Sequence, residues 1–183
     1  MDKAVDEAER AATILRRLRE FVERGEIKRS QAPLNEIVRE AAELALPEAR
    51  ENRIRMRFDL KGNLPPAHID RIQIQQVVFN LMRNAVEALQ GAERREIMVR
   101  TMPAGRHRLE VQIEDTGPGF DAAMLDQLFK TFVSTKLGGM GLGLSISHSI
   151  VSAHEGRLWA SETPGGGATL HFTVPVAGDG HGR

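Results

Sequence analysis

The run from Gln75 to Leu89 constrains the fold of this chain more than any other segment. Its apolar residues recur at every third or fourth position, which predicts an amphipathic helix. These apolar residues are Ile74, Val77, Val78, Leu81, Ala85 and Leu89. Asn80, Asn84 and Glu87 would then form one polar stripe, because residues three and four apart are neighbours on a helix surface. Amide and carboxylate oxygens suit Mg²⁺ beside phosphates. A polar stripe by itself is equally consistent with a helix face turned to water.

Three glycine-rich segments follow this helix in order. Residues Asp115 to Gly119 come directly after an alternating strand pattern, which indicates a strand that ends in an acidic residue and a sharp turn. Residues Gly138 to Ser145 run into an apolar helix pattern, so their backbone N–H groups would be available to a phosphate. Residues Gly165 to Thr169 precede a second alternating strand pattern. Each segment alone could be a plain turn, but together with the polar helix they indicate a nucleotide site.

Composition is compatible with one domain of ordinary size. With 183 residues, 41% of them hydrophobic, the chain can bury one core. Lys plus Arg and Asp plus Glu balance at 25 each, which predicts no nucleic-acid-binding surface and no direct membrane contact. Cysteine is absent, which fits a cytoplasmic location. No apolar run is long enough to predict a transmembrane helix, and the charged N-terminus does not resemble a signal peptide.

The chain divides into four expected parts. Residues 3–24 predict one helix whose apolar residues step by alternating four and three, which is the period of a coiled-coil or bundle seam. The alternative is a helix packed on its own domain. A polar linker at 26–32 separates this first part, residues 1–25, from a larger domain at 33–177. The tail at 178–183 is polar and glycine-rich, and we expect it to be disordered.

Within the larger domain, helices alternate with pairs of strands. Helices are expected from Leu34 to about Glu48, over the Asn80 segment, and from about Gly141 to His154. Strands are expected around 54–60, 67–69, 97–101, 109–113, near 158 and at 170–174. This order predicts an α+β fold, a two-layer α/β sandwich with helices on one face of a mixed sheet.

These motifs together resemble the catalytic ATP-binding domain of bacterial sensor histidine kinases, within the superfamily that includes gyrase, Hsp90 and MutL (the Bergerat fold). The resemblance covers roughly residues 30–176. The N box would be Asn80 to Ala85 and the F box Leu128 to Phe132. The three G boxes would be Asp115 to Gly119, Gly139 to Gly143 and Gly165 to Thr169. Residues Phe132 to Lys136 and Gly139 to Ser147 are most similar to the branch of oxygen-sensing nitrogen-fixation and dicarboxylate-sensing kinases. The helix at 3–24 would then be the end of a dimerisation and phosphoacceptor hairpin.

The resemblance implies roles for the residues of the nucleotide site. Asn84 would hold Mg²⁺ between the phosphates of ATP or ADP, with Asn80 added to the metal or phosphate shell, and Arg83 and Glu87 would lie beside them. Asp115 would accept the exocyclic amine of adenine. The remaining adenine contacts would come from Gly117, Gly119 and Thr169.

A short lid would close over the phosphates. Lys136 is the expected catalytic cation at the γ-phosphate, together with Asn80 and Asn84. The other lid and G-box residues expected to contact the nucleotide are Phe132, Ser134, Thr135, Gly139, Met140, Gly141, Leu142, Gly143 and Leu144.

Asn80 separates two reaction types. Gyrase-like hydrolases have a glutamate at this position that deprotonates water, and an amide cannot take that proton. The chain also has neither G-x-x-x-x-G-K-[ST] nor G-x-G-x-x-G. The resemblance therefore implies phosphoryl transfer to a protein, with a response-regulator receiver domain as the next partner.

The expected substrate is missing from the sequence. Histidine kinases phosphorylate a histidine followed by Glu or Asp and then Pro, and none of the six histidines has that context. His154, next to Glu155, is expected to cap or pack. We favour a piece of a longer kinase that phosphorylates a hairpin of its own or a sister chain. The alternative is a nucleotide-binding interaction module, either an anti-sigma-type serine kinase or a pseudokinase.

Overall fold

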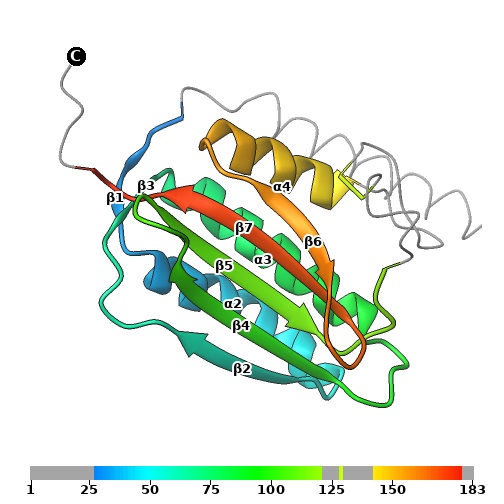
Figure 1. The fold of residues 1–183 in the computed structure, drawn as a ribbon. Helices are drawn as coiled ribbons and strands as arrows, with labels where there is room; N and C mark the ends of the chain where they lie inside the picture. The colour runs from blue at the N-terminus through cyan, green and yellow to red at the C-terminus, as the bar shows by residue number, and fades with distance from the viewer. Residues whose placement is uncertain (1–26, 121–127, 130–141, 179–183) are drawn as a thin grey trace, which may run out of the picture.

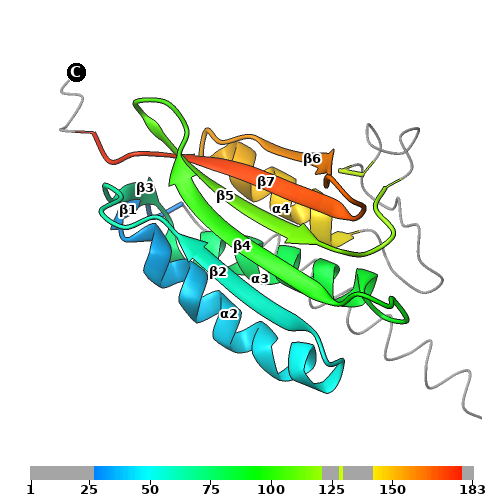
Figure 2. The same ribbon diagram turned by 60° about the horizontal axis from the view of Figure 1, so that its bottom comes forward.

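The computed structural model describes residues 27–120, 128–129 and 142–178. Five strands form a mixed sheet in the order β2-β4-β5-β7-β6, and two short strands, β1 and β3, pair separately. Helices α2, α3 and α4 lie together on one face of the sheet, and its other face has no helix among the described residues (Figures 1 and 2). The predicted two-layer arrangement is confirmed.

The elements follow the predicted order. The helices are α2 (Leu34–Glu51), α3 (Arg71–Ala88) and α4 (Leu142–Ala153). The strands are β1 (Ser30–Ala32), β2 (Arg55–Leu60), β3 (Ala67–Ile69), β4 (Glu96–Pro103), β5 (Arg108–Asp115), β6 (Leu158–Glu162) and β7 (Ala168–Pro175). None of the helices in the described ranges is long and apolar enough to cross a membrane.

Two local features differ from the expectation. Helix α2 continues to Glu51, three residues past the predicted end at Glu48, and its Ala49 is buried against the core. Residues 30–32, inside the expected linker, form strand β1 and pair antiparallel with β3. The predicted helix at 3–24 lies outside the described residues.

Two features of the sequence specify helix α3: a capping residue at its N-terminus and a continuous apolar face. Asp70 is the N-cap, and its side chain accepts hydrogen bonds from the backbone N–H groups of Ile72 and Gln73. Its buried residues are Ile74, Val77, Val78, Leu81, Met82, Ala85 and Val86, which include all five of the predicted apolar positions inside the helix. This face packs on the sheet and on α2 and α4, so the polar stripe of the same helix is turned away from the core.

Strands β4 and β5 alternate between buried and partly exposed residues, as the sequence predicts. They pair antiparallel, with Ile97 opposite Asp115 and Val99 opposite Ile113. β2 pairs parallel to β4 at one edge of the sheet, and β6 closes the other edge against β7. The pairing brings the end of β5 beside the start of β4.

The start of the described chain is attached to the end of α4. Arg29 donates hydrogen bonds to the Ala153 carbonyl oxygen and to the Glu155 carboxylate, both at 2.6 Å. His154 is fully buried, its Nδ1 donates to the Ile150 carbonyl oxygen at 2.8 Å, and its Nε2 accepts the Asp70 N–H at 3.0 Å. His154 therefore joins the end of α4 to the N-cap of α3, which confirms the expected packing role.

Burial lowers the pKa of His154 below its usual value of 6.5, so the folded protein binds fewer protons than the unfolded chain in mildly acidic solution. Its contribution to stability is complete above pH 6.5 and is lost as the pH falls from 6.5 towards the lowered pKa. We expect His154→Gln to lower the free energy of unfolding at pH 7.5 by about 1–3 kcal/mol. The wild type should lose more stability than this variant between pH 7.5 and 5.5, as measured by urea unfolding.

The exposed His107 provides the control, since His107→Gln removes an imidazole outside the core and should leave the free energy of unfolding at pH 7.5 unchanged. An identical pH slope in the wild type and in His154→Gln would contradict the assigned role.

Candidate functional site

The polar stripe of α3 forms one side of the candidate site. Asn80, Arg83, Asn84 and Glu87 are all half-buried. The Nε of Arg83 lies 3.4 Å from Oε1 of Glu87, one helical turn away. The Arg83 Nε and the Asn84 Nδ2 are buried and have no hydrogen-bond partner among the described residues. A buried donor without a partner costs about 1–3 kcal/mol, so this surface is suited to a ligand that supplies acceptors.

Asp115 lies at the end of β5, beside the last turn of α3. It is 6% exposed, and its Oδ1 accepts the Gly117 N–H at 2.8 Å. A Cβ at position 117 would lie 2.8 Å from that oxygen and 3.1 Å from the Ala88 carbonyl oxygen. The turn can therefore approach α3 this closely only with glycine at position 117.

The loop between β6 and β7 contacts the same turn. Gly167 has a φ of +110°, and a Cβ there would lie 1.9 Å from the Asp115 carbonyl oxygen. Gly119 has a φ of +79°, and a Cβ there would lie 3.0 Å from the Gly167 carbonyl oxygen. The first and third glycine-rich segments are therefore in backbone contact, although about 50 residues separate them.

Two threonines face each other across the base of the same β6–β7 hairpin. Thr169 is 6% exposed, and its hydroxyl oxygen lies 2.8 Å from that of Thr163, which is 8% exposed. Thr163 was not predicted, because the sequence shows only a threonine before Pro164 and gives no sign of a partner across the hairpin. A hollow of about 500 Å³ opens beside this hairpin. Its lining residues are Pro118, Gly119, Phe120, Glu162, Thr163, Pro164, Gly165, Gly166 and Gly167.

Thr116 is a second residue that the sequence reasoning missed. Its hydroxyl accepts the Glu96 N–H at 3.0 Å and donates to the Arg94 carbonyl oxygen at 2.9 Å. Its own N–H donates to the Glu96 carbonyl oxygen at 3.2 Å. These bonds hold the residue next to Asp115 against the start of β4. A Thr after the acidic residue is visible in the sequence, but its partners come from 20 residues away.

Helix α4 begins at Leu142, and Leu144 packs on the core. A Cβ at Gly143 would meet no atom within 4 Å, so no close packing requires glycine there. In the F box, Leu128 is buried, and the Phe129 ring stacks on His148 with centroids 5.6 Å apart. The other predicted lid residues lie outside the described residues. They are Phe132, Ser134, Thr135, Lys136, Gly139, Met140 and Gly141.

Within the described residues, the site thus combines buried donors on a helix that have no hydrogen-bond partner, a buried carboxylate and close backbone turns. The described residues contain no cluster of three or more His, Cys, Asp or Glu side chains that could hold a metal ion. A hard cation would have to share amide oxygens with the oxygens of a phosphate ligand, which is how Mg²⁺ commonly binds. The residues present fit that mode, because the Asn84 Nδ2 is buried without a hydrogen-bond partner among the described residues, so no described group holds that end of the amide.

Residues 69–178 match the family model described as histidine kinase-, DNA gyrase B- and HSP90-like ATPase. The chain is 47% identical to the sensor protein FixL of Bradyrhizobium diazoefficiens over 97% of its own length. It is 37% identical to the C4-dicarboxylate transport sensor protein DctS of Rhodobacter capsulatus over 98% of its length. It spans 35% of FixL and 27% of DctS.

Solved structures agree with the sequence comparison. The catalytic domain of the histidine kinase ThkA superposes with a TM-score of 0.74 at 29% identity, covering 81% of this chain and 96% of that domain. Full-length ShkA in complex with AMPPNP superposes with a TM-score of 0.74 at 27% identity, covering 84% of this chain and 32% of ShkA.

The fold and the site define a nucleotide-binding domain of the α/β sandwich type. The chain belongs to the family of histidine kinase-, DNA gyrase B- and HSP90-like ATPases, and its relatives make it the catalytic ATP-binding domain of a sensor histidine kinase. The predicted resemblance is confirmed, including its branch, since FixL and DctS are among the most similar relatives.

The contact between Gly167 and Asp115 can be tested by substitution. Gly165 and Gly167 both have a positive φ, but only Gly167 lies against another segment. Gly165→Ala should therefore cost only backbone strain, about 1–2 kcal/mol. Gly167→Ala adds a steric clash with the Asp115 carbonyl, so it should lower the free energy of unfolding by clearly more, as measured by urea unfolding. Equal losses in the two variants would argue against the contact.

Proposed function

We propose that this domain transfers the γ-phosphate of Mg²⁺-bound ATP to a histidine on a helix hairpin. The observation that carries the proposal is a pair of buried nitrogens, Arg83 Nε and Asn84 Nδ2, that have no hydrogen-bond partner among the described residues and lie on the helix whose last turn is against the Asp115 turn. One set of groups suits a polyphosphate and the other suits a base. The family match and the ShkA complex with AMPPNP support ATP as the nucleotide.

The α3 side chains would hold the phosphate end. The Asn84 amide oxygen would bind Mg²⁺, and Asn80, one turn earlier, would add to the metal or phosphate shell. Mg²⁺ neutralises phosphate charge when it is bound. The Arg83 Nε, which is buried without a hydrogen-bond partner among the described residues, would donate to a phosphate oxygen. Glu87 would keep the Arg83 guanidinium in place through their 3.4 Å contact.

The Asp115 turn would hold the adenine end. A carboxylate buried to 6% exposure accepts an exocyclic amine well, because no water competes for it. Gly117 and Gly119 let the base approach the backbone. Thr169, hydrogen-bonded to Thr163, would contact the base directly or through a water.

In the proposal, the lid covers the γ-phosphate and so completes the nucleotide site. Lys136 would approach the γ-phosphate, with Ser134 and Thr135 as hydroxyl donors and Phe132 at the base of the lid. Backbone N–H groups from Gly139, Met140, Gly141, Leu142, Gly143 and Leu144 would contact the phosphates at the start of α4.

In the transfer step, a ring nitrogen of the histidine forms a bond to the γ-phosphorus while the bond from that phosphorus to the β,γ-bridging oxygen breaks, and ADP leaves. Positioning and charge neutralisation account for most of the catalysis of such reactions. Asn80 favours this transfer over hydrolysis, because its amide cannot remove a proton from water.

The partners of the domain follow from the same proposal. Residues 1–25 would belong to the hairpin, 26–32 to the connection and 33–177 to the catalytic domain. A response-regulator receiver aspartate would accept the phosphoryl group from the histidine. ThkA was crystallised with the response regulator TrrA, and that complex superposes with a TM-score of 0.79 at 25% identity, covering 94% of this chain and 49% of ThkA. The cytoplasmic location expected from the sequence stays a prediction.

Asp115→Asn should weaken binding of fluorescent ADP about tenfold to a hundredfold, because it removes the charged acceptor without changing the size of the side chain. Titration by fluorescence anisotropy measures this loss. Urea unfolding of the variant provides the control for folding, since the amide keeps an oxygen that can accept the Gly117 N–H. Unchanged affinity in a folded variant would place the base elsewhere.

Asn84→Ala should act differently from Asp115→Asn. It should leave nucleotide binding without Mg²⁺ nearly unchanged and remove the gain in affinity that Mg²⁺ brings to the wild type. Titrations with and without Mg²⁺ give both values. A variant that still responds fully to Mg²⁺ would show that Asn84 does not hold the cation.

The reaction itself is tested by following labelled γ-phosphate. We expect transfer to a supplied hairpin that carries the phosphoacceptor histidine, and none to the same hairpin with that histidine replaced by Gln. Transfer to a serine-bearing partner instead would support the anti-sigma-type alternative. Tight binding without transfer to either would support a pseudokinase.

A further inference from the structure

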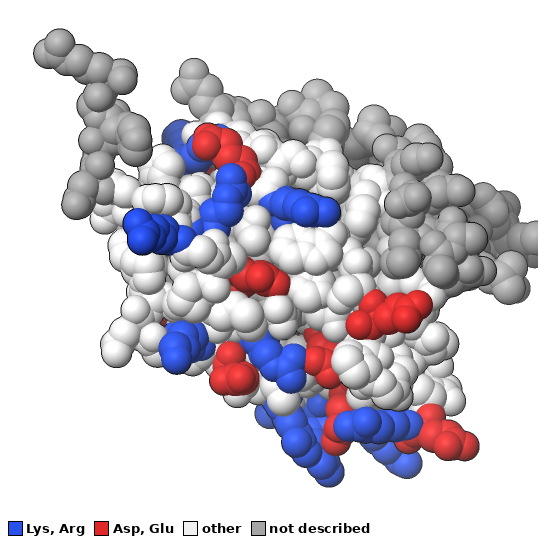
Figure 3. All heavy atoms as spheres, viewed as in Figure 1, with Lys and Arg blue, Asp and Glu red and all other residues white. Residues whose placement is uncertain are grey.

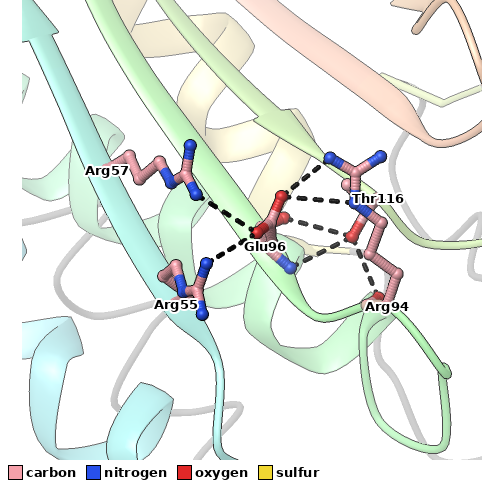
Figure 4. Close-up of polar contacts among 5 residues, drawn as sticks. All are labelled: Arg55, Arg57, Arg94, Glu96 and Thr116. Carbon is pink, nitrogen blue, oxygen red and sulfur yellow. Dashed lines mark hydrogen bonds and ion pairs between the residues drawn. The ribbon is translucent and has the colours of Figure 1, made fainter.

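A cluster of arginines surrounds one carboxylate at the edge of the sheet. Glu96 is the first residue of β4, and its carboxylate forms ion pairs with three guanidinium groups (Figure 4). The N···O distances are 2.7 Å to Arg94, 3.4 Å to Arg55 and 3.6 Å to Arg57. The Glu96 side chain is 24% exposed, whereas those of Arg55, Arg57 and Arg94 are 67%, 53% and 70% exposed. We call these three arginines and Arg53 the arginine cluster.

The arginine cluster carries more positive charge than its neighbours balance. Two carboxylates, those of Glu96 and Glu93, lie beside the four guanidinium groups of the cluster, each of which has five N–H donors. The hydrogen bond from Arg94, with the charges of Arg57 and Arg55, lowers the pKa of Glu96 below its usual value, so Glu96 is ionised at neutral pH. Figure 3 shows basic side chains gathered near the lower edge of the sheet face, with acidic ones among them. Most of the donor capacity of the cluster faces solvent.

A hollow of about 650 Å³ lies against the cluster. Arg53, Arg55, Arg94, Arg95 and Glu96 line it together with the loop at 91–93. Arg95 supports the wall, because its guanidinium donates to the carbonyl oxygens of Ala92 and Asn52. The open side of the hollow is therefore lined by the exposed Arg53, Arg55 and Arg94, with the exposed Glu93 as one acidic neighbour.

Arg53 has an unusual backbone conformation for its residue type. Its φ is +56°, and it directly follows Asn52, the C-cap of α2. Helices usually place Gly or Asn at such a position, and another residue costs about 1–2 kcal/mol there. The chain accepts this cost and has a guanidinium on the rim of the hollow instead of a glycine.

We propose that the arginine cluster binds an acidic, extended polypeptide segment of a protein partner. Arg55 and Arg57 lie on the same side of β2, which is the edge strand, so they are about 6.6 Å apart along it. Alternate side chains of an extended segment have the same spacing. The hollow is open at the sheet edge, and salt screens the attraction between an exposed arginine and a single ion. Several carboxylates on one chain bind together, so a polypeptide fits this surface better than a small anion.

The proposed segment would bind beside the nucleotide site. The Thr116 hydrogen bonds join the residue after Asp115 to the backbone of Arg94 and Glu96. A partner bound to the arginine cluster would therefore contact the start of β4, to which the Asp115 turn is hydrogen-bonded through Thr116. Nothing in this inference requires the nucleotide to be present, so it is tested without nucleotide and separately from the proposed function.

The test uses a fluorescein-labelled peptide of alternating glutamate and serine, followed by anisotropy at low salt. The wild type should bind it, and Arg55→Gln with Arg57→Gln should weaken binding about fivefold to tenfold. Arg39→Gln with Arg106→Gln removes the same charge from two exposed arginines that have no ion pair among the described residues. This control should change binding less than about twofold.

Three outcomes would overturn the proposal. In the first, the acidic peptide fails to bind the wild type. In the second, both double variants lose affinity equally, which would show a general charge effect. In the third, pyrophosphate binds at the cluster while the acidic peptide does not, which would show a small-anion site. Urea unfolding of both double variants confirms that the comparison is between folded proteins.

Discussion

The packing of α3 against the sheet positions both ends of the candidate site. The buried residues Ile74, Val77, Val78 and Leu81 are fully inaccessible to solvent, and each such side chain contributes about 1.5–3 kcal/mol. This burial sets the rotation of the helix about its axis. Because one face of the helix is packed on the core, the residues of the polar stripe must point away from it. The last turn of the helix then lies against the end of β5. A one-residue change in the helix phase would bury the amides and expose the core residues.

The contacts among the glycine-rich segments depend on that placement. Gly117 lies against Ala88 at the end of α3, and Gly167 lies against Asp115. Neither contact leaves room for a Cβ, so the chain accepts the entropic cost of glycine to bring three backbone segments together. The buried nitrogens of Arg83 and Asn84, which have no hydrogen-bond partner in the part of the chain that the structure describes, add a second local cost. Both costs fall within the candidate site, where a bound nucleotide would offset them.

Helix α4 connects this site to the place where the chain enters the domain. It follows the predicted lid in the sequence and ends at Ala153, just before His154, which is hydrogen-bonded to the N-cap of α3. Arg29, two residues past the start of the described chain, binds the end of the same helix. The start of the described chain is therefore attached to the C-terminal end of α4. On the sheet edge, the arginine cluster is attached to the Asp115 turn in a comparable way, through Thr116.

The local pattern of the chain was sufficient to predict most elements, because each strand or helix has a period that matches its burial. The alternation along β4 and β5 and the spacing along α3 are cases in point. Strand β1 was missed, since three residues carry no period and pair with β3 only after the chain has folded. The helix at 3–24 and the lid remain predictions, as they lie outside the described residues.

By itself, the sequence determined the order of the elements, the polar stripe on α3 and the glycine positions, because local periodicity and the absence of a Cβ are properties of the chain. Only the tertiary structure decided which groups meet. Thr163 with Thr169, Thr116 with Glu96, and three arginines around one carboxylate all join residues whose proximity depends on strand register and helix packing. The distances between these residues are set by how the whole core packs, so no local pattern in the sequence predicts them.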